Sequence, residues 1–220
     1  MTLINNDKTN TFSNLQTFIL SVIISLVLLF VYSKNSLIYP MNDFCDENNF
    51  FSITDAIFHG RVLYKDVFDH KGPFLYLVYS LIHILGNSYF TVYLFECIAC
   101  ALFAYFGTKT ILLYDEEATK ARTCLYVLCL TFCLCTSATF MFGGTVEELY
   151  LWMSSYGLYV TLRCLKQGQY YSAKELVTMG LLCGALFWTK YSLLGFYSGL
   201  TIFVIGWNIA QKEPKRLGKR

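Results

Sequence analysis

The chain has 220 residues, of which 55% are hydrophobic, 18% aromatic and only 15% charged, whereas roughly 25% of the residues of an average soluble domain are charged. This composition predicts an integral membrane protein rather than a soluble one. The formal net charge is +2, which gives no support for nucleic-acid binding.

Six stretches of the chain approach the roughly 20 apolar residues that a helix needs to cross a bilayer. The first contains FILSVIISLVLLFVY, which is too long for the core of a signal peptide and is followed by no cleavage site with small residues, so a retained helix is predicted. The predicted spans are residues 15–33, 90–114, 124–142, 148–165, 175–190 and 193–210. The expected fold is therefore an all-α integral membrane protein with about six transmembrane helices.

The distribution of basic residues gives the expected topology. Residues 74–86 are apolar but short and include His83, which favours a juxtamembrane or re-entrant helix over a crossing. With six spans, only five of the 17 lysine and arginine residues lie on the outer side. These five are Lys34, Arg61, Lys65, Lys71 and Lys190. The positive-inside rule then places both termini in the cytoplasm.

This topology divides the chain into three parts. Residues 1–14 form a cytoplasmic N-terminus, residues 15–210 a transmembrane domain, and residues 211–220 a basic cytoplasmic tail. The first outer loop, residues 34–89, holds most of the polar residues outside the spans. Short juxtamembrane helices are expected within this loop.

The first of these helices is predicted over residues 46–59, because Phe50, Ile53 or Thr54, and Ile57 share one face and polar residues occupy the other. Asp43 is the expected N-cap, and Gly60 the end of the helix. The following residues are expected to be extended or turned, and Pro73 suits the first turn of the next short helix.

The nine cysteines do not predict a disulfide framework, because only Cys45 lies in the outer loop. Cys97 and Cys100 form a CxxC pair, but no histidine or second pair supports a metal site there. The other cysteines are expected to pack between helices as small apolar residues.

Two groups of outer-loop residues could carry chemistry. Asp46 lies where a carboxylate can reach both a lipid headgroup and an acceptor in water; the alternative is that the acids beside it only cap a helix. The segment YKDVFDHKGP holds Asp66, Asp69, His70 and Lys71 within six residues. It could bind a phosphate or a metal ion, or it could be a solvated loop.

Further charged residues are predicted at the same membrane face. Glu148 follows a Gly-Gly turn at the outer end of the fourth predicted span, and Lys190 ends the fifth. Glu96 lies inside a span, where an acid needs a partner; Lys71 or Lys190 could pair with it, or it could be a protonated structural residue. Together these residues suggest a cavity at the outer leaflet for an anionic amphiphile.

The outer loop resembles the first outer loop of membrane glycosyltransferases of the GT-C superfamily. The resemblance is carried by DENNFFSITDAIFHG and VLYKDVFDHKGPFLYLVYSLIHILGNS, and more weakly by GGTVEELYL and GLLCGALFWTKYS. The nearest members are bacterial proteins related to the protein O-mannosyltransferases and the lipid A aminoarabinose transferases. The loop residues that match the family pattern in order are Asp46, Gly60, Tyr64, Asp66, His70, Lys71 and Pro73.

The resemblance implies a transferase of the bacterial plasma membrane that uses a polyprenyl-phosphate sugar as donor. Asp46 would activate or orient an acceptor hydroxyl, and Lys71 and Lys190 would neutralise the donor phosphate. Glu148 would contact the sugar or the acceptor. Asp66, Asp69 and His70 would shape the site or bind a divalent metal ion, which only some members of the superfamily use.

Members of the family usually continue for several hundred residues beyond the length of this chain. The expectation is therefore a complete transferase or its N-terminal catalytic half, with a C-terminal half or partner subunit missing. Two alternatives remain: a non-catalytic membrane partner, and a transporter or flippase of a lipid-linked solute.

Overall fold

The computed structural model describes residues 11–212, and most of the expected N-terminal segment 1–14 and basic tail 211–220 lies outside that range. The described residues contain helices and no strand, apart from an isolated bridge between Leu63 and Val67. The all-α prediction is therefore confirmed for this part of the chain. The helices are α1 (Asn14–Tyr32), α2 (Cys45–Phe58), α3 (Pro73–Leu85), α4 (Tyr89–Leu112), α5 (Lys120–Cys135), α6 (Val146–Gln167), α7 (Ala173–Phe187), the 3-10 helix η2 (Tyr191–Leu194) and α8 (Gly195–Lys212).

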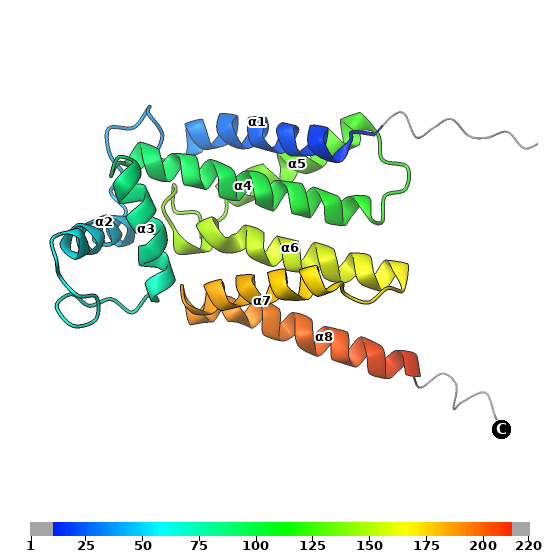
Figure 1. The fold of residues 1–220 in the computed structure, drawn as a ribbon. Coiled ribbons are helices and arrows are strands. Elements are labelled where there is room, and N and C mark those ends of the chain that lie inside the picture. The colour runs from blue at the N-terminus through cyan, green and yellow to red at the C-terminus, as the bar shows by residue number, and fades with distance from the viewer. Residues whose placement is uncertain (1–10, 213–220) are drawn as a thin grey trace, which may run out of the picture.

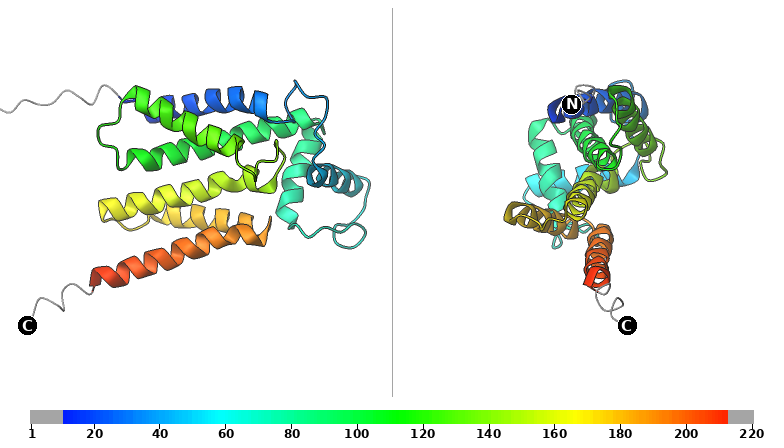
Figure 2. Two further views of the ribbon diagram at one scale, coloured as in Figure 1. Left: turned by 180° about the vertical axis from the view of Figure 1, so that it is seen from behind. Right: turned by 90° about the vertical axis from the view of Figure 1, so that its right-hand side faces the viewer.

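Six helices form a bundle in which successive members run in opposite directions (Figure 1). These are α1, α4, α5, α6, α7 and α8. The short helices α2 and α3 lie together at one end, where α3 runs across the direction of the bundle (Figure 1). The described chain begins and ends at the opposite end, and α8 lies at the edge of the bundle in the end-on view of Figure 2.

Hydroxyl side chains start most of the bundle helices, because a side-chain oxygen can accept a hydrogen bond from the free backbone N–H groups of the first turn. These capping residues are Ser13, Ser88, Thr119, Thr145 and Ser172. At the other terminus, Gly168 ends α6 in the left-handed conformation that glycine adopts without strain. Local sequence thus accounts for most of the helix boundaries.

Among residues 11–212, three segments are long and apolar enough to cross a membrane: Asn14–Tyr32, Tyr89–Leu112 and Tyr191–Ala210. The helices α5 and α7 have only 16 and 15 residues, or about 24 and 22 Å at 1.5 Å per residue, against a hydrocarbon core of about 30 Å. The helix α6 has 22 residues but carries charged side chains at both ends. Of the six predicted spans, three are therefore supported by length and composition.

Two predicted boundaries were wrong. The span predicted over 124–142 becomes a helix that ends at Cys135. The chain then turns, with Met141 and Phe142 in the left-handed backbone region. Asp43 is not the N-cap of α2, because Phe44 occupies that position. Asp43 instead accepts a charge-assisted hydrogen bond from Lys34 at 2.5 Å, which lowers the pKa of the Asp43 carboxyl.

The helix α1 turns its hydroxyl residues inward and its large apolar residues outward. Thr17, Ser21, Ser25 and Leu29 are buried, each four residues from the next, while side chains such as Ile23 are exposed. The buried face packs against α4 and α5. Small inward residues allow close helix approach without a hydrophobic driving force, as between helices in a bilayer. This pattern agrees with the length and composition of α1 as a membrane span.

The outer-loop helices form where the sequence predicts them. In α2 the side chains of Phe50, Ile53 and Thr54 are buried, as the amphipathic pattern requires. Pro73 begins α3, because proline is pre-organised for the first helical position and its missing N–H is not needed there. Phe50 packs edge-on against Tyr79 of α3, with ring centroids 5.2 Å apart.

The segment before α3 is fixed to the end of α7 by backbone hydrogen bonds. The N–H of Gly72 donates to the carbonyl of Thr189 at 2.7 Å, and the N–H of Phe74 donates to the carbonyl of Trp188 at 3.0 Å. A Cβ atom at Gly72 would collide with the Trp188 carbonyl group. Only glycine therefore allows the two backbones to approach this closely.

We expect Gly72→Ala to lower the free energy of unfolding by about 1–3 kcal/mol, the usual cost of overpacking a closed contact. Thermal denaturation of the purified full-length protein in detergent micelles measures the change. Gly180→Ala is the matched control, because a Cβ there meets no atom within 4 Å. Equal stability of the two variants would contradict the close contact.

Candidate functional site

A chain of polar contacts joins the start of α2 to α3 through the segment that precedes α3. The Tyr76 hydroxyl donates to Asp69 Oδ2 at 2.5 Å. Asp69 Oδ1 lies 3.0 Å from His70 Nδ1, and His70 Nε2 lies 2.9 Å from Lys71 Nζ. Lys71 Nζ donates to Asp46 Oδ2 at 3.3 Å. Asp46 and Lys71, which come from different parts of the outer loop, are thus in direct contact.

Burial differs sharply along this chain. The side chain of Lys71 is 4% exposed and that of Asp69 5%, whereas those of Asp46 and His70 are 51% and 70% exposed. Because an ammonium group can only donate, His70 Nε2 must accept from Lys71, which leaves the proton on Nδ1 to be donated to Asp69. The buried ammonium of Lys71 is thus bonded to His70 on one side and to the half-exposed carboxylate of Asp46 on the other.

Residues 60–69 form the loop that leads to Lys71, and hydrogen bonds fix the conformation of this loop. The Tyr64 hydroxyl donates to the carbonyl of Lys71 at 2.6 Å. Asp66 accepts from the N–H of Val62 at 2.8 Å and so closes a local turn. Of the predicted loop residues, Asp69, His70 and Lys71 are brought together with Asp46, and Asp66 is bonded apart from them. Within residues 11–212, no group of three or more His, Cys, Asp or Glu side chains is arranged to hold a metal ion.

Lys190 is connected to the Lys71 segment through the hydrogen bond between Gly72 and Thr189. It follows Thr189, the residue that accepts from Gly72, and its ammonium forms an ion pair with Glu147 of α6. The two lysines predicted to bind phosphate are therefore the immediate neighbours of the residues in one backbone hydrogen bond: Lys71 precedes Gly72, and Lys190 follows Thr189. Each has a carboxylate partner, since Lys71 pairs with Asp46.

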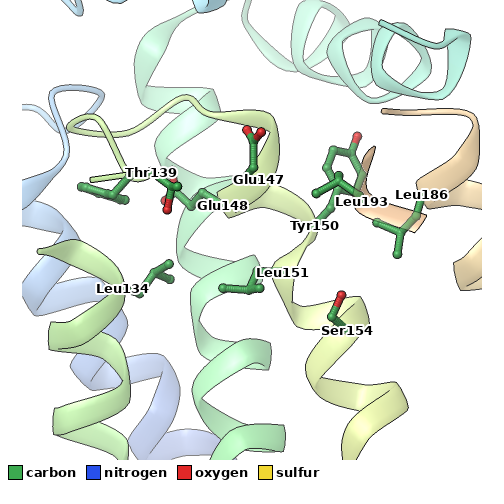
Figure 3. A pocket seen from close by; sticks show the side chains of 10 residues that line it. Leu134, Thr139, Glu147, Glu148, Tyr150, Leu151, Ser154, Leu186 and Leu193 are labelled. Carbon is green, nitrogen blue, oxygen red and sulfur yellow. The ribbon is translucent and has the colours of Figure 1, made fainter. Parts of the chain in front are cut away.

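A pocket of about 230 Å³ lies on the other side of Glu147. Its polar lining includes Glu147, Glu148, Thr139 and Ser154, and its apolar lining comes from α5, α6 and α7. Figure 3 shows the carboxylates of Glu147 and Glu148 pointing in different directions from the first turn of α6. Both oxygens of Glu148 and the hydroxyl of Tyr150 are buried and have no protein hydrogen-bond partner.

Glu96 is fully buried in α4 and does not pair with either lysine named as its candidate partner. Its Oε2 accepts from the Ser33 hydroxyl at 2.7 Å. Its Oε1 accepts from the side-chain amide of Asn35 at 2.7 Å and from the N–H of Gly144 at 2.5 Å. Neutral donors therefore satisfy this acid, and the predicted ionic partners were wrong.

Glu47 is the functional candidate that sequence reasoning missed. As one of the acids beside Asp46 it was considered only for helix capping, but it is completely buried and accepts from the Asn42 amide at 2.6 Å. The signal was available, because Glu47 precedes Phe50 by three residues and Thr54 by seven and so shares the buried face of α2. Burial, and then the charge of nearby Glu96, raise the pKa of Glu47 to about 9.

No protein-family model, curated protein or solved structure significantly matches this chain.

We expect Tyr76→Phe to lower the free energy of unfolding by about 1–3 kcal/mol, because it leaves a buried Asp69 oxygen without its donor. Chemical or thermal denaturation in detergent measures the loss. Tyr126→Phe removes an equivalent 2.5 Å bond to Asp115 at the other end of the bundle, where the carboxylate is more exposed. A larger loss from Tyr126→Phe than from Tyr76→Phe would contradict this account.

Proposed function

We propose that this chain is a membrane glycosyltransferase of GT-C type, or the N-terminal catalytic half of one, which transfers a sugar from a polyprenyl-phosphate donor to an acceptor on the outer face of the membrane. The observation that carries the proposal is the contact between the buried Lys71 ammonium and the half-exposed Asp46 carboxylate. This contact supports the proposal because an ammonium group suited to a phosphate touches a carboxylate suited to general-base catalysis, in a chain with helices long enough to reach across a bilayer.

The contact also suggests the order of events. The Lys71 side chain is buried and bonded to His70, whereas its other partner, Asp46, is half exposed at the start of α2. A donor phosphate can therefore displace Asp46 from Lys71 without moving the lysine. The displaced carboxylate is then unpaired and next to the anomeric carbon, where it can accept the proton of an acceptor hydroxyl. Lys71 stabilises the charge that builds on the leaving phosphate.

Lys190 and Glu148 extend this site toward the pocket. Lys190 would supply a second positive charge to the phosphate on exchanging its bond with Glu147. Glu148 would hydrogen-bond the sugar or the acceptor through its two unpartnered oxygens. Asp69 and His70 would orient Lys71, and Asp66 would hold the turn above it.

The proposed topology is six spans with both termini in the cytoplasm of a bacterium. Two features support it: the alternating direction of the six bundle helices, and the position of the site elements at the end away from both described chain ends (Figure 1). Basic residues at the opposite end, such as Lys109, Lys120 and Lys166, fit a cytoplasmic side. The shorter helices α5 and α7 would cross with help from adjacent polar ends or a thinner bilayer.

A second candidate is a non-catalytic partner subunit of such an enzyme. It is favoured by the pairing of both lysines with carboxylates, which leaves neither ammonium open to a phosphate. The two candidates differ in whether a phosphate can replace Asp46 at Lys71.

We expect Asp46→Asn to lower sugar transfer by about 10²–10⁴-fold, the usual contribution of a positioned base, and at the same time to tighten binding of polyprenyl phosphate. Asparagine cannot take the proton, and it no longer competes for Lys71. Transfer is measured as release of radiolabelled sugar from polyprenyl-phosphate donors by membranes that contain the full chain. Asp43→Asn is the control, because Asp43 pairs with Lys34 outside the site. Transfer unchanged in Asp46→Asn, with the native chain active, would refute the catalytic role.

Lys71→Met is expected to weaken polyprenyl-phosphate binding at least tenfold, because it removes the buried positive charge. Lys65→Met in the same loop is the matched control, since Lys65 is exposed and forms no ion pair among the described residues. Binding is measured with a fluorescent polyprenyl phosphate and the purified protein. If the native chain binds the lipid no better than Lys71→Met, the partner-subunit candidate is favoured.

A further inference from the structure

Three buried carboxyl groups meet where the outer loop joins the bundle. Glu47 of α2 and Glu96 of α4 are 0% exposed, and Glu148 of α6 is 2% exposed. Asn42 connects two of them, because its amide donates to Glu47 Oε2 at 2.6 Å and to the side-chain oxygen of Asn35 at 3.1 Å, while Asn35 donates to Glu96. We call Glu47, Glu96 and Glu148 the carboxyl cluster.

The backbone between α5 and α6 is folded around this cluster. Gly143 and Gly144 both have positive φ angles, 99° and 84°. A Cβ atom at Gly143 would collide with Glu96, and one at Gly144 would collide with Glu47. The turn thus requires glycine both for its conformation and for its close approach to the two acids.

No lysine, arginine or histidine within the described residues bonds to any of the three carboxyl groups. The two lysines at this end, Lys71 and Lys190, pair with Asp46 and Glu147 instead. Three ionised carboxylates in one buried region without a cation would be very costly, since each loses its hydration and repels the others. Because no cation neutralises these groups, at least some of the three carboxyl groups must be uncharged.

The hydrogen-bond inventory points to how this occurs. Glu47 Oε1 and both oxygens of Glu148 have no donor in the protein. A carboxyl group that carries a proton becomes a donor as well as an acceptor. The hydroxyls of Tyr79 and Tyr150 are likewise buried and unpartnered. Tyr79 lies within electrostatic range of all three acids, and its pKa is raised mainly by burial and then by their charges.

We propose that the carboxyl cluster is a proton-binding site, which holds protons at neutral pH and uses them to fasten α2 to the helix bundle. The ligand is the proton, exchanged through the pocket that Glu148 lines. If two of the three carboxyl groups were ionised, their charges would repel each other between α2, α4 and α6 and would loosen α2. The cluster shares Glu148 with the proposed transferase site but contains neither Asp46 nor Lys71, so proton binding can be measured without sugar transfer.

The titratable groups around the cluster contain no cation. Tyr79 faces it from α3, and Tyr150 from α6. From deeper in the bundle the thiols of Cys97, Cys100 and Cys135 lie within electrostatic range of Glu148. Phenol and thiol groups are neutral at pH 7 in apolar surroundings, so they add no compensating charge.

Infrared spectroscopy tests the proposal on the purified full-length protein. A protonated carboxyl group in a buried site gives a C=O stretching band that shifts in heavy water, and ordinary exposed acids give none at pH 7. We expect the native chain to show this band at pH 7 and Glu47→Gln and Glu148→Gln each to reduce it. Glu117→Gln is the control, because Glu117 is exposed, and it should leave the band unchanged.

Stability against pH supplies a second readout. The pKa of Glu47 rises from 4.5 when unfolded to about 9 when folded, so the folded state keeps a proton that the unfolded state has lost. Stability should therefore fall as pH rises between these values. Glu47→Gln cannot ionise and should flatten this dependence. Absence of the band from the native chain at pH 7, or a band unchanged in both glutamine variants, would overturn the proposal even if a variant folds poorly.

Discussion

The hydrogen bonds accepted by Glu96 are the constraint on which the outer end of the molecule depends. This acid lies about two turns into α4, and it accepts hydrogen bonds from Ser33 and Asn35 after α1 and from Gly144 before α6. Segments far apart in the sequence are thereby fixed to α4. A buried acid without donors would be costly, so the two loops cannot move away without large loss. Asn42 and Glu47 continue the network into α2, and Asp46 directly precedes Glu47. The position of the candidate catalytic carboxylate therefore depends on a group two helices away.

The same constraint explains why the predicted span over residues 124–142 ends early. Its second half, TSATFMF, is apolar enough to continue a helix, but the chain has to bring Gly143 and Gly144 onto Glu96 and Glu47. It does so by leaving the helix at Cys135 and passing through two residues with left-handed backbone. Hydropathy measures the preference of a segment for lipid and carries no information about a distant acid that requires its backbone N–H groups.

Local patterns predicted the elements well and the partners poorly. The amphipathic face of α2 and Pro73 at the start of α3 followed from residues close in sequence. The partner of Glu96 did not, because charge alone suggested a lysine, whereas amide and hydroxyl donors satisfy the acid without burying a second charge. Asp43 similarly pairs with Lys34 instead of capping α2. Such choices depend on which groups the whole fold brings within 3 Å of each other, and sequence spacing does not determine that.

Two kinds of charge compensation lie side by side at this end of the bundle. Near water, Asp46 and Glu147 pair with Lys71 and Lys190, and the two carboxylate side chains are 51% and 38% exposed. Deeper in, the carboxyl cluster has no cation and is compensated by neutral donors and, as we propose, by protons. Asp46 and Glu47 are adjacent in α2, but Asp46 pairs with a lysine and Glu47 belongs to the carboxyl cluster. A fixed position of α2 requires both sets of contacts at once. Because the backbone of α2 carries both carboxyl groups, any rotation of this helix displaces Asp46 from Lys71 and Glu47 from Asn42 together.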